Sequence, residues 1–135
     1  MTHMKKNILV VDDSALMRRV MCDIINSDSK FQATDYCRDG LEAYEKLKHT
    51  SYDGVVLDVN MPRMDGLQLL EKLQKEGIRA NVVMVSTLTD SREADVTILA
   101  MERGAIDFVA KPTNIIEAKG EAFKRQLLGV LDAVL

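Results

Sequence analysis

Residues 7–13, Asn7-Ile8-Leu9-Val10-Val11-Asp12-Asp13, decide the fold of this chain. Val10 and Val11 are apolar at successive positions, which is typical of a strand that helices cover on both faces. Two aspartates end the run just where a helical periodicity begins at Ser14. The carboxyl edge of a parallel sheet is where such folds keep their active sites. The stretch therefore predicts a parallel α/β sheet with an acidic site at one edge.

The same alternation of short apolar runs and 3.6-residue periodicity continues along the chain. Strands are expected near residues 8–11, 32–36, 55–57, 81–85 and 107–109. A helix is expected after each strand, the first over residues 14 to about 26 and the last over about 115 to 134. Five such units predict a doubly wound, five-stranded parallel sheet. Right-handed crossovers then place all the strand ends at one edge.

Local signals support the helix boundaries. Four polar residues precede a Glu or Gln at capping-box spacing, namely Asp39 before Glu42, Asp65 before Gln68, Asp90 before Glu93 and Asn114 before Glu117. Gly77 and Gly104 lie where the third and fourth helices should stop. Apolar stripes on the first and last helices are expected to face the core, and they comprise Leu16, Val20 and Ile24, and Phe123, Leu127, Val130 and Val134.

Composition limits the function classes. The 135 residues suit one domain over residues 1–135, with 47% hydrophobic and 29% charged residues. A net charge of -3 gives no broad basic face, so nucleic acid is not expected as a partner. No apolar stretch approaches the roughly 20 residues of a membrane span, and we expect a cytoplasmic protein. Cys22 and Cys37 lack metal-ligand spacing and are expected to be structural thiols.

Three aspartates are expected to meet at the sheet edge: Asp12, Asp13 and Asp58. Converging carboxylates repel one another and raise each other's pKa unless a cation offsets them. Mg²⁺ prefers oxygen ligands, keeps several waters and typically accepts one or two protein carboxylates. Asp13 and Asp58 are therefore the expected direct ligands of Mg²⁺, with Asp12 acting through water.

Asp58 is also the candidate nucleophile. It follows the central strand and precedes a loop that Pro62 stiffens and Gly66 frees. A carboxylate fixed beside a metal could form an aspartyl phosphate. Lys111 and Ser86 follow two other strands, where they could bind the incoming phosphoryl oxygens. This set indicates phosphoryl transfer to a carboxylate.

Each assignment has a structural alternative. Asp13 could cap the first helix, Asp65 is expected to cap the third helix, and Ser86, Lys111 and Phe108 could be a strand-end hydroxyl, a loop charge and a core side chain. A metal-dependent phosphatase with an aspartyl nucleophile would show Asp-x-Asp after the first strand, whereas Asp12-Asp13-Ser14-Ala15 stands here. A nucleotide-binding domain would show a glycine-rich turn there, and no glycine precedes Gly40.

The chain closely resembles the response-regulator receiver domain of two-component signalling. The resemblance covers about Ile8 to Pro112 and rests on residues 10–14 (VVDDS), 57–66 (LDVNMPRMDG) and 109–112 (VAKP). It implies a flavodoxin-like sheet in the order 2-1-3-4-5 and a histidine kinase that donates phosphate to Asp58. The magnesium ligands it implies are Asp12, Asp13 and the Asn60 carbonyl. It further implies that Lys111 contacts the phosphoryl group, that Ser86 and Phe108 switch, and that Lys111-Pro112 is a cis peptide.

A narrower resemblance concerns residues 12–19, 83–89 and 104–109, which look like the receiver half of chemotaxis-type protein-glutamate methylesterases. It implies either the regulatory domain of a longer enzyme or a stand-alone receiver that docks to a partner. This chain contains no methylesterase nucleophile, so we expect no esterase activity from it. Thr87 stands where many receivers have alanine or glycine. We expect its bulk to restrict access of water or phosphodonor to Asp58.

Overall fold

The computed structural model describes residues 4–87 and 93–135. Its strands are β1 (Lys6–Val11), β2 (Phe31–Cys37), β3 (Gly54–Asp58), β4 (Val82–Ser86) and β5 (Ala105–Ala110). Its helices are α1 (Ala15–Asn26), α2 (Gly40–His49), α3 (Gly66–Lys75), α4 (Glu93–Glu102), α5 (Ile115–Ala118) and α6 (Glu121–Val134). All five expected strands are present, each within a few residues of its predicted bounds.

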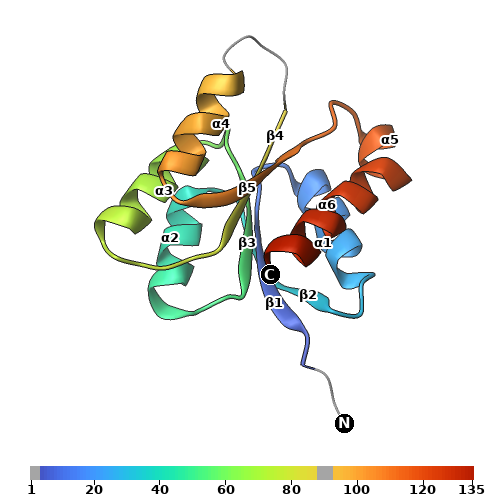
Figure 1. Cartoon of the computed structure of the whole chain (residues 1–135), viewed down its shortest axis with the longest axis horizontal. Coiled ribbons are helices and arrows are strands. Elements are labelled where there is room, and N and C mark those ends of the chain that lie inside the picture. Colours follow the sequence, from blue (N-terminus) through green and yellow to red (C-terminus); the bar gives the residue numbers. More distant parts are fainter. Residues whose placement is uncertain (1–3, 88–92) are drawn as a thin grey trace.

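The strands form one parallel sheet in the order β2-β1-β3-β4-β5, which confirms the predicted fold. Helices α1, α5 and α6 cover one face of the sheet, and α2, α3 and α4 cover the other (Figure 1). The chain therefore reverses its winding direction between β1 and β3. In such sheets the crevice at the reversal point is the ligand-binding position.

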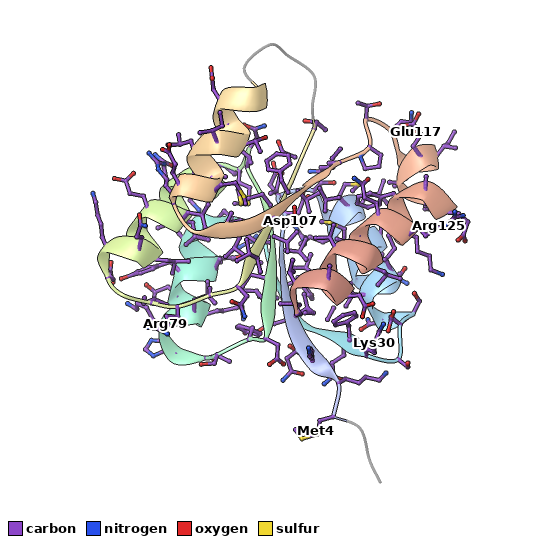
Figure 2. The ribbon with its side chains drawn as sticks, viewed as in Figure 1. Met4, Lys30, Arg79, Asp107, Glu117 and Arg125 are labelled. Atoms are coloured by element: carbon purple, nitrogen blue, oxygen red, sulfur yellow. The ribbon has the colours of Figure 1, made fainter. Side chains whose placement is uncertain are left out.

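Alternating residues of the strands fill two separate cores. On β1, Ile8 and Val10 pack with α1 and α6, whereas Leu9 and Val11 pack with α2 and α3. All four side chains are fully buried. Figure 2 shows side chains from both helical layers packed against the sheet. Burial on both faces explains why this strand is apolar at successive positions.

Capping confirms the helix starts that can be examined. The side chains of Asp39, Asp65 and Asn114 accept from the Glu42, Gln68 and Glu117 amides at 3.0, 2.8 and 2.9 Å, while the expected Asp90 cap lies outside the described residues. Helix α1 is capped by Ser14, which accepts from the Met17 amide at 3.2 Å. Asp13 is therefore not the cap of α1 and keeps its carboxylate for other contacts.

Three expectations about this part of the fold were wrong. Leu16 is 53% exposed. The buried face of α1 includes Met17 and Met21, so Leu16 lies at the edge of that face. The last helix is two helices, because Gly120 has an extended backbone and starts α6 anew. The Lys111-Pro112 peptide is trans, the form favoured for proline by about 0.5–1 kcal/mol.

Matched leucines test the revised core. Leu127 on α6 is fully buried, whereas Leu16 is largely exposed. We expect Leu127→Ala to lower the free energy of unfolding by about 2–5 kcal/mol through lost burial and an internal cavity. Leu16→Ala should change it by less than about 0.5 kcal/mol. Urea denaturation of both variants measures the difference, and equal losses would contradict this assignment of faces.

Candidate functional site

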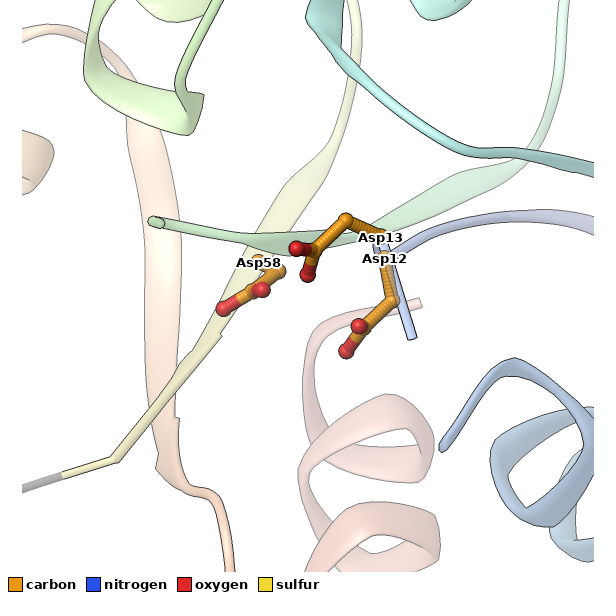
Figure 3. A group of neighbouring side chains, drawn as sticks. All are labelled: Asp12, Asp13 and Asp58. Atoms are coloured by element: carbon orange, nitrogen blue, oxygen red, sulfur yellow. The ribbon is translucent and has the colours of Figure 1, made fainter. Parts of the chain in front are cut away.

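Three carboxylates converge at the reversal point of the sheet. Asp12 and Asp13 directly follow β1, and Asp58 ends the adjacent strand β3. One oxygen from each lies within 4.8 Å of the other two. Figure 3 shows the three side chains at neighbouring strand ends. Asp12 and Asp58 are buried while Asp13 is exposed, so the cluster opens to solvent on the Asp13 side.

The backbone around Asp12 is held from several directions. Its Oδ1 accepts from the Ser14 amide at 2.8 Å, and its carbonyl accepts from the Arg18 guanidinium at 2.8 Å. Its own amide donates to the Cys37 carbonyl of β2 at 3.1 Å. These bonds orient the other carboxylate oxygen, Oδ2, toward the interior of the site.

Lys111 joins the two buried carboxylates. Its Nζ lies 2.7 Å from Asp12 Oδ2 and 3.3 Å from Asp58 Oδ2. Its amide donates to the Ser86 carbonyl at 2.8 Å, which anchors the residue after β5 to the end of β4. Burial alone would lower the pKa of Lys111, but the two carboxylates outweigh it and raise that pKa, so the amine stays charged.

Ionisation of the buried Asp58 carboxyl group is unfavourable. Burial, together with the nearby Asp12 carboxylate, raises the pKa of Asp58 to about 7, although Lys111 opposes the shift. A carboxylate with this pKa is costly to ionise without a further cation. The site is therefore suited to a ligand that brings positive charge.

The donor set fits a hard divalent cation. Three carboxylates face one ammonium group, which leaves an excess of negative charge. Although Lys111 lies close to Asp12 Oδ2, the geometry gives this buried oxygen no directed hydrogen bond within the described part of the chain. Oxygen ligands with waters completing the shell are what Mg²⁺ prefers. Asn60 is exposed in the loop after β3, and its role as a carbonyl ligand stays a prediction.

The other expected site residues lie around this cluster. Ser86 is buried as the last residue of β4, with the half-buried Thr87 next to it. Pro112 is half-buried directly after Lys111. Phe108 is half-buried on β5 and packs against the core that includes residues of α3 and α4. The roles of these residues in switching and access remain predictions.

Sequence reasoning missed one ion pair beside the site. Arg63 contacts Asp39 through two nitrogens, and Asp39 is only 3% exposed. Asp39 was expected only as the cap of α2, which it also is. No local pattern in the sequence signals this pair, because residues 39 and 63 lie 24 positions apart.

Comparison with known proteins identifies the family. Residues 8–120 match the response regulator receiver domain. The chain belongs to this family. The response regulator domain of Thermotoga maritima CheB is 35% identical, with a TM-score of 0.80 over 97% of this chain and 94% of that chain. A second neighbour, in a CheX-CheY-BeF3-Mg²⁺ complex from Borrelia burgdorferi, is 29% identical, with a TM-score of 0.73 over 93% of this chain and 89% of that chain.

Curated relatives of this receiver domain are longer proteins. Protein-glutamate methylesterase/protein-glutamine glutaminase from Pyrococcus horikoshii is 45% identical over 92% of this chain and 33% of its own length. The protein of the same name from Escherichia coli is 50% identical over 80% of this chain and 30% of its own length. The chain thus spans about one third of the length of these relatives.

The raised pKa of Asp58 predicts a pH-dependent effect of its replacement. Because the folded-state pKa of about 7 exceeds the ordinary 3.8, the contribution of Asp58 to stability becomes less favourable as the pH rises from 4 through 7. In metal-free buffer, Asp58→Asn should therefore stabilise the domain more at pH 8 than at pH 5, by about 2–3 kcal/mol. Urea denaturation at both values measures this, with the exposed Asp23→Asn as control. An equal effect at the two pH values would contradict the burial argument.

Proposed function

We propose that this receiver domain accepts a phosphoryl group on Asp58 from a histidine kinase and works as a magnesium-dependent switch. The observation that carries the proposal is the grouping of Asp12, Asp13 and Asp58 within 4.8 Å, with Lys111 bridging two of them. Related receiver structures include one solved with BeF3 and Mg²⁺. We also propose that the domain works in the cytoplasm.

The transfer is a displacement at phosphorus. A carboxylate oxygen of Asp58 forms a bond to phosphorus as the bond from phosphorus to the donor nitrogen breaks, and the electron pair leaves with that nitrogen. Asp12, Asp13, Asp58 and the Asn60 carbonyl would hold Mg²⁺, which supplies positive charge to the phosphoryl oxygens. Lys111 already stands beside Asp58 and would contribute further positive charge.

We assign the response to phosphorylation to Ser86 and Phe108, and an effect on its reversal to Thr87. Ser86 ends β4 at the level of the site and would donate its hydroxyl to a phosphoryl oxygen. Phe108 lies on the neighbouring strand β5. Its inward turn after Ser86 moves would reshape the face formed by α4, β5 and the helix that follows β5. Thr87 would restrict the access of water or phosphodonor to Asp58 and would thereby affect the dephosphorylation rate.

We further propose that the domain regulates a protein-glutamate methylesterase in chemotaxis. The curated relatives carry that name, and the domain spans about one third of their length. The alternative is a stand-alone receiver that signals by docking to a partner protein. Both alternatives use the same site at Asp58.

A small phosphodonor tests the phosphoacceptor role. Incubation with acetyl phosphate and Mg²⁺ should add one phosphoryl group to the wild-type domain and none to Asp58→Asn, as measured by intact-protein mass spectrometry. Lys111→Ala should lower the labelling rate by about 10- to 1000-fold, because charge stabilisation of the transferred group is lost. Equal labelling of wild type and Asp58→Asn would reject Asp58 as the acceptor.

The size of the natural gene product distinguishes the two settings. We expect an antibody raised against this domain to detect a species about three times its length in lysate of the source cells, in keeping with the curated relatives. Detection of a product of 135 residues alone would favour the docking receiver.

A further inference from the structure

The loop between β3 and α3 contains an unusual backbone. Arg63 has a φ of 66°, and it is the one non-glycine residue with positive φ in the described ranges. The Met64 amide donates to the Pro62 carbonyl at 2.7 Å, which closes a three-residue turn around Arg63. Such turns are rare and strained, and they persist only where the surroundings hold them.

The start of α2 supplies that restraint. The Nε and Nη2 atoms of Arg63 lie 2.8 and 2.5 Å from Asp39 Oδ2, while Asp39 Oδ1 caps the helix through the Glu42 amide. The Gly40 amide donates to the Met64 carbonyl at 2.9 Å. A Cβ at Gly40 would lie 2.5 Å from that carbonyl oxygen, so the close approach depends on glycine.

The connection between β2 and α2, which contains Asp39, also contacts the part of the acidic site that follows β1. The Cys37 carbonyl accepts from the Asp12 amide at 3.1 Å, three residues before Gly40 contacts the loop. Residues 37–40 therefore touch the segment that carries Asp12 and Asp13 and also the loop that follows Asp58. This connection spans the two halves of the site, and Asn60 lies in the loop that it holds.

We propose that the Asp39–Arg63 ion pair positions the β3–α3 loop for metal binding, by keeping Asn60 at a fixed place relative to Asp12, Asp13 and Asp58. Asp39 and Arg63 are positioning residues, since neither belongs to the carboxylate cluster. The inference rests on the proposed function, because it concerns the magnesium site. Hydrogen bonds from the Glu42 amide and Arg63 overcome the effect of burial and lower the pKa of Asp39, so its carboxylate stays charged.

Conservative variants separate positioning from folding. Asp39→Asn keeps an oxygen to cap α2 but loses the charge that pairs with Arg63. Arg63→Asn removes the guanidinium while tolerating a left-handed backbone, and Arg63→Lys retains a positive charge. Arg38→Gln is the matched control, since the side chain of Arg38 forms its ion pair with Glu42 at the same end of α2 and not with Asp39.

Two measurements test the proposal on the whole domain. Isothermal titration calorimetry with MgCl₂ should show binding on the order of tenfold weaker for Asp39→Asn and for Arg63→Asn. The double variant should be no weaker than either single variant, and Arg63→Lys should be intermediate. In the metal-free protein, the Met64 and Gly66 amides should exchange with deuterium faster in these variants than in wild type or Arg38→Gln.

The outcomes separate this inference from the proposed function. If wild type binds Mg²⁺ and the Asp39 and Arg63 variants bind it as tightly as Arg38→Gln does, the inference is wrong, even where those variants melt at a lower temperature. If wild type does not bind Mg²⁺, the metal part of the proposed function fails, and the inference fails with it. Weaker binding together with faster loop exchange, both confined to the Asp39–Arg63 variants, supports the inference.

Discussion

The contact of Lys111 with two buried carboxylates is the constraint on which the site depends. Asp12 directly follows β1 and Asp58 ends the adjacent strand β3, but Lys111 follows β5, which is separated from β3 by β4. The lysine reaches across because its amide is bonded to Ser86 at the end of β4. Four strands must therefore end at matching levels before one ammonium group can serve both carboxylates. Formation of the site therefore depends on the correct register of these four strands.

This arrangement satisfies the buried charges only in part. One lysine faces three carboxylates, and the remaining repulsion, added to burial, raises the pKa of Asp58 to about 7. A site selected for stability alone would replace such a group by an apolar or neutral one. A phosphoacceptor cannot do so, because the carboxylate is the reacting group. Under the proposed function, the electrostatic cost at Asp58 follows from its role as the acceptor, and the apolar cores on both faces of the sheet contribute the compensating stability.

The carboxylate cluster could be predicted from the sequence because Asp12 and Asp13 follow one apolar run and Asp58 follows another. Right-handed crossovers then bring Asp12, Asp58 and Lys111 together without further information. Leu16 was misplaced because its stripe shares a helix with a second stripe, containing Met17 and Met21, that is equally apolar. The Asp39–Arg63 pair could not be predicted, since it joins residues 24 positions apart that no local pattern relates.

Residue 63 shows why local and tertiary preferences conflict near this site. Glycine would adopt a φ of 66° with little strain, but it has no side chain to hold the loop. Arginine is less favourable for the backbone, yet its guanidinium reaches the buried Asp39 and fixes the turn to α2. A free loop would have to be ordered each time that a metal bound, which would weaken binding. If the loop helps to hold Mg²⁺ as proposed, the strained backbone at Arg63 is the cost of preorganising the loop, and such conflicts are expected at functional sites.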